Sequence, residues 1–424
     1  MSAAPAVIRV SEEDGRRPDA VDPVSPRARA ALIRLCAAGF VAYCSYAICR
    51  TPLLPLFARE LGAGPALIGF VMGASTLTGI VVKLPAGALS DVFGRRRLLL
   101  AGAAVFATLP FTYLLASTVV ALVLLRFVHG SATAIFGPVA SASLSDIAPA
   151  TKRGTWLSAY STAQGAGQAL GSVLAGYLIA AGRFDLAFAV AGVMGIGVPV
   201  IVSGWRGNTE VRPHREPWQE FKRGVAEVGR DRLVLVTGGA QAAQFVLNGT
   251  LNAFLPLYGR EVLGLSVTQL GWLFGVQTLT TLAVRPAIGY LSDRLGRRWV
   301  IVTGLVACSA AVLLVSVATN MSEIVTAVLV YAAGVATTTA ATSAYITDMT
   351  RRARYGAAHG VFGTIYDIGD ALGPIVAGVL VAVVGYTQMF QVMAAVAFTM
   401  AAAFAAASRI GVTEVCRAEC DAST

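Results

Sequence analysis

The sequence predicts an all-α polytopic membrane protein, with twelve transmembrane helices in two pseudo-symmetric six-helix bundles. Of the 424 residues, 56% are hydrophobic and only 13% are charged, which leaves too little polar surface to cover a water-soluble globule. A polar motif occurs at residues 87–97 and again at residues 289–298, each time between two long apolar runs. The chain is therefore a duplicated membrane bundle.

Twelve apolar runs justify the helix count. Spanning about 30 Å of hydrocarbon takes about 20 apolar residues per helix. Runs of that length lie at 30–50, 65–86, 98–116, 119–143, 155–181, 184–204, 233–258, 266–291, 299–319, 322–346, 356–384 and 386–407. They divide the chain into an N-terminal segment (1–29), a first bundle (30–204), a linker (205–232), a second bundle (233–407) and a C-terminal tail (408–424).

The basic residues predict the orientation. A net charge of +10 in a soluble protein would be typical of nucleic-acid binding. However, 26 of the 33 Lys and Arg lie in the two termini, the linker and the even-numbered loops, counting Arg34 at the start of the first run with the N-terminal segment. This asymmetry follows the positive-inside rule and predicts two cytoplasmic termini in a bacterial-type plasma membrane. The linker is then cytoplasmic, either as a solvated surface segment or as a regulatory or lipid-headgroup site.

The repeated motif is a tight polar turn. It reads Gly87-Ala-Leu-Ser-Asp91-Val-Phe-Gly94-Arg95-Arg-Arg in the first bundle and Gly289-Tyr-Leu-Ser-Asp293-Arg-Leu-Gly296-Arg297-Arg in the second. Glycines close such a turn, the aspartates can accept from helix-end amides, and the arginines stay on the cytoplasmic side. Asp146 and Asp348 lie just before the next basic loops, where we expect them to pair with Arg95 and Arg297.

This pattern resembles the signature loop of the major facilitator superfamily of secondary transporters. The resemblance implies two bundles related by an axis along the membrane normal, with a substrate cleft between them. It also implies a gating role for the loop residues and their aspartate partners. The run at 356–384 contains Gly373-Pro374, similar to a glycine and proline motif of antiporters in this superfamily that normally lies on helix five, so these two residues join the gating candidates.

An ionisable residue inside a span is costly and is a functional candidate by default. Arg126 begins Arg126-Phe-Val-His129-Gly130, which resembles a helix-four motif implicated in proton coupling, with His129 in the place of the usual glutamine. The alternative is an arginine that only locks two helices together by a salt bridge.

Two polar stripes are predicted to face the cleft. Tyr43, Tyr46 and Arg50 share one face of the first helix. The seventh helix carries Gln241, Gln244, Asn248 and Asn252. In the superfamily these helices line the central cavity, so the resemblance makes both stripes substrate-binding candidates. The alternative is that these groups lie at headgroup level or tie helices together.

Asp367 and Asp370 are the proton-coupling candidates. They lie about 11 and 14 residues from the cytoplasmic end of their run, roughly 16–21 Å deep at about 1.5 Å per residue. A carboxylate at that depth either pairs with a cation or holds its proton. The alternative is a permanent salt bridge to Arg50 or Arg126. Lys83 and Arg285 occupy equivalent positions in the two bundles and are expected to extend to the cytoplasmic face as structural residues.

The sequence thus predicts a secondary transporter with alternating access, most similar to efflux members of the superfamily. We expect a proton-coupled antiporter that exports a drug-like or toxic compound. The alternative is a transporter of a small organic anion or phosphate ester, because Arg50 and Arg126 bring positive charge to the cleft. Hydrolase, metalloprotease and nucleotide-binding motifs do not occur, which disfavours an enzyme; nothing favours a channel or receptor. We expect a monomer in the lipid bilayer, with the substrate and protons as partners, and no nucleic acid, cofactor or metal.

Overall fold

The computed structural model describes residues 25–205, 229, 231–350 and 355–422, without the side chains of 84–85, 87–88, 91–92, 150, 349, 355–357 and 409–422. These residues form helices and no strand, which confirms the all-α class. The first half contains α1 (Pro26–Ile48), α2 (Leu53–Glu60), α3 (Pro65–Phe93), α4 (Arg95–Thr112), η1 (Tyr113–Leu115), α5 (Val119–Ile147), η2 (Ala150–Lys152), α6 (Arg153–Ala180) and α7 (Phe184–Ser203). The second half contains α9 (Arg232–Glu261), α10 (Val267–Leu295), α11 (Arg297–Val317), α12 (Met321–Met349) and α13 (Tyr355–Ala422).

The twelve predicted spans are all present among the described residues. α13 contains two of them, because its backbone breaks at Gly385, where φ is 81°. The short α2 continues α1 and is not a span. The predicted N-terminal segment and linker lie almost entirely outside the described residues, as do the side chains of the predicted tail.

Local sequence signals explain where several helices begin and end. Thr118 accepts a hydrogen bond from the amide of Ala121 at the start of α5. Ser266 and Gln269 form a reciprocal capping box at the start of α10. Between α3 and α4 the chain turns at Gly94 (φ 88°), and between α10 and α11 it turns at Gly296 (φ 84°), a conformation that glycine adopts without strain. The glycines of the repeated motif therefore close their turns as predicted.

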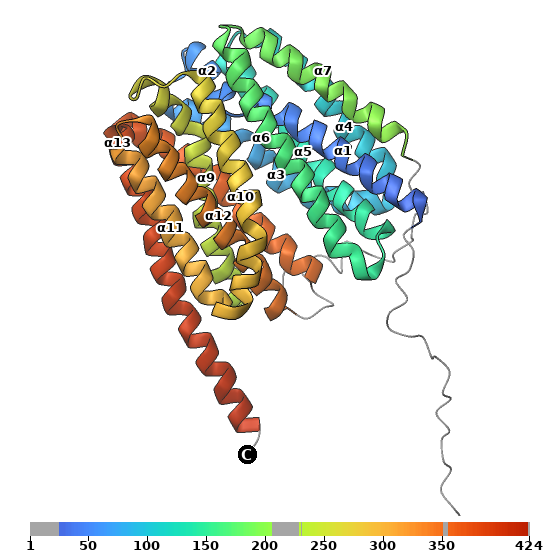
Figure 1. Cartoon of the computed structure of the whole chain (residues 1–424), viewed down its shortest axis with the longest axis vertical. Helices are drawn as coiled ribbons and strands as arrows, with labels where there is room; N and C mark the ends of the chain where they lie inside the picture. The colour runs from blue at the N-terminus through green and yellow to red at the C-terminus, as the bar shows by residue number, and fades with distance from the viewer. Residues whose placement is uncertain (1–24, 206–228, 230, 351–354, 423–424) are drawn as a thin grey trace, which may run out of the picture.

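The two halves repeat the same packing (Figure 1). α1 packs against α6 as α9 packs against α13, and α3 packs against α5 as α10 packs against α12. The halves meet through two equivalent pairs of helices, α3 with α13 and α6 with α10. The duplication seen in the sequence therefore also appears in the helix–helix contacts of the two halves.

The halves are joined at one end of the molecule and separate at the other. We call the end that holds α2 the α2 side, and the end where α1 and α4 begin the termini side. On the α2 side a single hydrophobic core contains residues of both halves. On the termini side the first half has its own core around Leu99, Phe136 and Trp156, and the second has its own around Ile301 and Phe404.

Small residues permit the close contact between α3 and α13. A Cβ atom added at Gly69 of α3 would overlap the carbonyl oxygen of Pro374, and one added at Gly378 of α13 would lie 2.5 Å from the carbonyl oxygen of Pro65. On the other side of α13, a Cβ atom at Gly373 would overlap the carbonyl oxygen of Val246 in α9. Gly373 and Pro374 thus lie where α13 is wedged between its own half and the opposite half.

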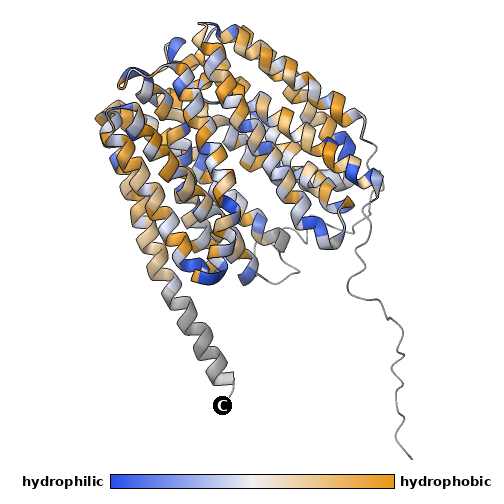
Figure 2. Cartoon of the chain, viewed as in Figure 1, coloured by the Kyte–Doolittle hydropathy of each residue, from blue (hydrophilic) through white to orange (hydrophobic). Residues whose placement is uncertain are grey.

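Apolar residues cover the long helices and hydrophilic residues gather at their ends and turns (Figure 2). Eight stretches of the described residues are long and apolar enough to cross a membrane, and the last of them contains both parts of α13. α6, α9 and α10 have the length of a span but are not among these stretches. The cavity explains why they are more polar.

Candidate functional site

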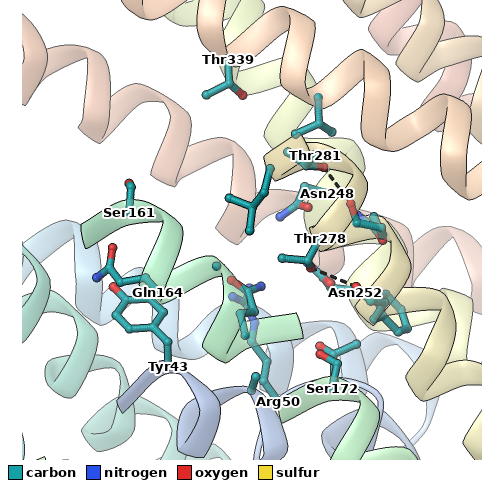
Figure 3. A pocket seen from close by; sticks show the side chains of 18 of the residues that line it. Tyr43, Arg50, Ser161, Gln164, Ser172, Asn248, Asn252, Thr278, Thr281 and Thr339 are labelled. Carbon is teal, nitrogen blue, oxygen red and sulfur yellow. Dashed lines mark hydrogen bonds between the residues drawn. The ribbon is translucent and has the colours of Figure 1, made fainter. Parts of the chain in front are cut away.

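A cavity of about 310 Å³ lies between the halves (Figure 3). Its wall comes from α1, α6, α9, α10 and α12, and the shared core closes it on the α2 side. Its lining includes Tyr43, Tyr46, Arg50, Ser161, Gln164, Gly165, Gln168, Ser172, Gln244, Phe245, Asn248, Asn252, Phe274, Gln277, Thr278, Thr281, Arg285 and Thr339. Amides and hydroxyls predominate on the walls from α6, α9 and α10, so the three helices that are not among the apolar spans all face the cavity, together with α1 and α12.

The polar stripe predicted on the first helix faces this cavity. Tyr43, Tyr46 and Arg50 all contribute to its wall, although Tyr46 is 8% exposed. From the predicted stripe on the seventh helix, which is α9, Gln244, Asn248 and Asn252 also line it. Both stripes therefore lie where a bound molecule would contact them.

Gln241 does not line the cavity. Its amide nitrogen donates to Gln244 Oε1 at 2.8 Å and to Thr339 Oγ1 at 3.3 Å, and its oxygen accepts from Thr342 Oγ1 at 2.5 Å. Because every one of these bonds is made within the second half, Gln241 holds α9 against α12 and orients Gln244.

Asp370 is the centre of a hydrogen-bonded network across the two halves. Its Oδ2 accepts from Arg50 Nη2 at 3.2 Å and from Thr76 Oγ1 at 3.1 Å, both of the first half. Its Oδ1 accepts from Asn248 Nδ2 at 3.0 Å. A single carboxylate therefore links α1, α3 and α9 to α13 beside the cavity. The Arg50 pairing is one of the two alternatives that the sequence left open.

Asp367 pairs with Lys83, also across the two halves. Lys83 Nζ lies 2.5 Å from Asp367 Oδ2, and the two side chains are 36% and 9% exposed. This corrects the expectation that Lys83 extends to the membrane face, and it replaces Arg50 and Arg126 as the expected partners of Asp367. The physical reason is that burying the Asp367 carboxylate without a partner would cost more free energy than Lys83 would gain by reaching the headgroups.

Arg126 is fully buried and pairs with no carboxylate among the described residues. Its Nη2 donates to Ser75 Oγ at 2.5 Å and to Tyr46 OH at 3.4 Å, while Nε and Nη1 have no hydrogen-bond partner in the part of the chain that the structure describes. The alternative of a salt bridge between Arg126 and an aspartate of α13 is therefore not found among the described residues, where Arg50 binds Asp370 and Lys83 binds Asp367. Arg126 contacts the cavity only through Tyr46, whose ring lies 5.6 Å from its guanidinium carbon and 5.9 Å from that of Arg50.

His129 lies behind the cavity wall with Arg126. It is 0% exposed, and its Nδ1 is 3.1 Å from the hydroxyl of Tyr113. Its Nε2 has no hydrogen-bond partner among the described residues. Neither Arg126 nor His129 lines the cavity, which corrects their expected place as substrate contacts in this conformation.

The repeated loops hold matching ion pairs. Arg95 Nε bonds Asp146 Oδ2 at 3.2 Å, and Arg297 Nε bonds Asp348 Oδ2 at 2.8 Å, as predicted. Asp293 pairs with Arg297 at 2.6 Å rather than with helix-end amides. A Cβ atom added at Gly289 would meet open space. The surroundings of Gly87 and Asp91 lie outside what the structure describes.

Sequence reasoning missed several residues of the wall. Gln164, Gln168 and Gln277 line the cavity and were not among the candidates. Arg285 lines it too, which corrects the expectation that this residue extends to the cytoplasmic face. The signal was present, since each is a polar side chain inside a span, but no resemblance pointed to these helices.

The comparisons with known proteins agree with this architecture. The family model described as Major Facilitator Superfamily matches the chain twice, over residues 35–267 and 237–411. An uncharacterized MFS-type transporter of Methanocaldococcus jannaschii is 25% identical over 344 residues, covering 80% of this chain and 88% of that protein. The multidrug resistance protein MdtG of Citrobacter koseri is 26% identical over 363 residues, covering 81% and 87%.

A solved structure has a similar fold. It is a bacterial homologue of the human lysosomal transporter Spinster in an inward-facing and occupied conformation, with a TM-score of 0.76 and 17% sequence identity. The similarity covers 91% of this chain and 97% of that one. At this identity the likeness concerns the arrangement of helices.

Proposed function

Because the chain belongs to the major facilitator superfamily, whose members are transporters rather than enzymes, we propose that it is a proton-coupled antiporter that exports a small drug-like or toxic compound by alternating access. The multidrug resistance proteins among its relatives support export as the direction of transport. The cavity between the halves supports binding of a small molecule at mid-membrane.

One observation carries the proton coupling. Asp367 and Asp370 of α13 are each held by a cation of the opposite half, Asp367 by Lys83 and Asp370 by Arg50. Protonation of a carboxylate removes the charge that binds its cation, so it weakens the contact between α3 and α13. Uptake of a proton from one side of the membrane and its release to the other would then bias which side the cavity opens to.

The same geometry supports an assignment of sides. With both termini in the cytoplasm of a bacterial-type plasma membrane, the termini side is cytoplasmic and the sealed α2 side is external. A cysteine introduced at Leu115, which is 82% exposed at the end of η1, should then react with a membrane-impermeant thiol reagent added to whole cells. Reaction only after the cells are broken would reverse this orientation.

The coupling can be tested with a compound identified by resistance and uptake profiles of cells with and without the chain. In proteoliposomes, Asp370→Asn, and to a lesser extent Asp367→Asn, should retain exchange of this compound between equal pools but lose accumulation driven by a pH gradient. Asp185→Asn is the matched control, because that carboxylate is exposed and pairs with Arg183 outside the cavity. Accumulation at the wild-type level in the double variant of Asp367 and Asp370 would exclude α13 as the proton path.

A further inference from the structure

Arg285 is a cation of the cavity wall that has no partner among the described residues. It lies on α10, inside a span, and lines the cavity. No hydrogen bond or ion pair reaches it from any other residue that the structure describes, and its Nε is buried without a partner. A half-buried guanidinium that binds nothing is costly, since the hydration it has lost is not replaced.

The equivalent residue of the first half shows what Arg285 lacks. Lys83 of α3 occupies the same place in the repeat, and Asp367 of α13 neutralises it. The residue that corresponds to Asp367 in the first half is Gly165 of α6. Gly165 also lines the cavity, and a Cβ atom there would lie 2.8 Å from Leu282, one helical turn before Arg285. The repeat therefore retains the cation at this interface but has lost its carboxylate.

The charge balance of the cavity follows from these contacts. The described residues of the wall include no Asp or Glu, and Arg50, the other wall cation, is bound by Asp370. Arg285 is thus left as an uncompensated positive charge, which attracts anions and repels cations in a poorly hydrated site.

We propose that the compound transported by this protein carries an anionic group, a carboxylate or a phosphate, and that Arg285 binds it. A planar guanidinium donates two parallel hydrogen bonds to either group. Gln277, two helical turns before Arg285, lines the same wall, and its side-chain amide offers a donor beside the anion. Phe245, Phe274 and Tyr43 give the cavity apolar surface for the rest of the molecule. Its volume of about 310 Å³ admits one small organic acid.

This inference rests on the proposed function and specifies its substrate class. Four probes that share a naphthalene ring and differ in charge test it: 1-naphthoate, 1-naphthyl phosphate, the neutral 1-naphthamide and the cation 1-naphthylmethylammonium. Their binding to the purified full-length protein in lipid nanodiscs is measured by equilibrium dialysis, through the fluorescence of the naphthalene. The two acids separate a carboxylate site from a phosphate site.

Four variants isolate the charge of Arg285. Arg285→Gln should weaken binding of the preferred acid by about 10- to 100-fold, the usual contribution of charged hydrogen bonds, and Arg285→Lys should weaken it less. Gly165→Asp supplies the missing carboxylate and should weaken acid binding more than Gly165→Asn, which has the same volume. Arg294→Gln is the control on the same helix, because Arg294 is exposed and stacks on Tyr290 at 4.4 Å, away from the cavity.

The results separate the substrate class from the transport mechanism. Failure of both acids to bind the wild-type protein, or equal affinity of wild type and Arg285→Gln, would overturn the inference. If a pH gradient drives accumulation of 1-naphthamide equally in both proteins, the inference fails while proton-coupled transport stands. If acid binding depends on Arg285 but no pH gradient drives accumulation, the proposed coupling fails and the anion site stands.

Discussion

Removing Lys83 alone should destabilise the protein more than removing both partners of the Lys83–Asp367 pair. The 2.5 Å contact joins a carboxylate that is 9% exposed to a lysine that is 36% exposed. Lys83→Met leaves the buried carboxylate unpaired, whereas Asp367→Asn leaves a lysine that can still reach water. We therefore expect Lys83→Met to be the more destabilising change and the double variant to resemble Asp367→Asn. In its exposure to solvent this pair is intermediate between two kinds of ion pair. Exposed pairs contribute about 0–1 kcal/mol, and disrupting a buried pair costs about 3–5 kcal/mol, so the coupling energy here should be about 1–2 kcal/mol.

The protein contains its own reporter for this measurement. Cys44, Cys49 and Cys308 are free and buried, so a thiol-reactive fluorophore reports when they become accessible. Denaturant titrations of the wild type, both single variants and the double variant in one detergent give the double-mutant cycle. Additive changes, within about 0.5 kcal/mol, would show that the two side chains do not stabilise each other and would refute the interpretation of this contact as a link between the halves.

Three further predictions concern the contacts that hold the closed side and the gating loop. Gly69→Ala should destabilise the α3–α13 contact by about 1–3 kcal/mol and slow transport. Gly79→Ala is the control and should transport normally, because its added Cβ meets only a side-chain carbon at 3.8 Å. Equal transport rates of the two variants would contradict the close-packing argument. Asp91→Asn should reduce transport without preventing membrane insertion or substrate binding, and wild-type turnover would remove this residue from gating. Arg59→Gln breaks the 3.0 Å pair with Glu261, whose side chains are 46% and 31% exposed. We therefore expect the free energy of unfolding in a denaturant titration to fall by at most about 1 kcal/mol, and by less at high salt. A fall several times larger would show that the pair is shielded from solvent.

The fold was predictable because its signals are repeated and strong. Long apolar runs, two copies of one loop and the placement of basic residues all lead to the same arrangement, and Gly94 and Gly296 adopt the backbone conformation that their loops require. The pairing of Arg95 with Asp146 was also predictable, because both lie at the ends of neighbouring helices and the pair recurs in the second half.

The partners inside the membrane were less predictable. Asp367 was a functional candidate because of its depth, but its partner depended on which helix of the opposite half it faces. Lys83 was expected to extend to the membrane face because it lies close to that face in the sequence. In the structure α3 packs against α13 across the two halves, which brings Lys83 to Asp367. A one-dimensional sequence contains no direct signal for that contact. Arg126 shows the same limitation, because its burial next to Ser75 depends on how α5 and α3 pack.

The polar character of α6, α9 and α10 has a consequence for how the chain enters the bilayer during synthesis. Insertion at the translocon depends on how favourably each nascent segment partitions into lipid, and polar side chains near a segment's centre oppose that transfer. In the first half, α1, α3, α4 and α5 are all apolar enough to insert before α6 emerges. In the second half, α9 and α10 are synthesised first, and the first strongly apolar segment is α11. We therefore expect nascent α9 and α10 to remain beside the translocon until α11 has been made, so that a ribosome stalled soon after Leu295 would hold two helices that are not yet stably integrated.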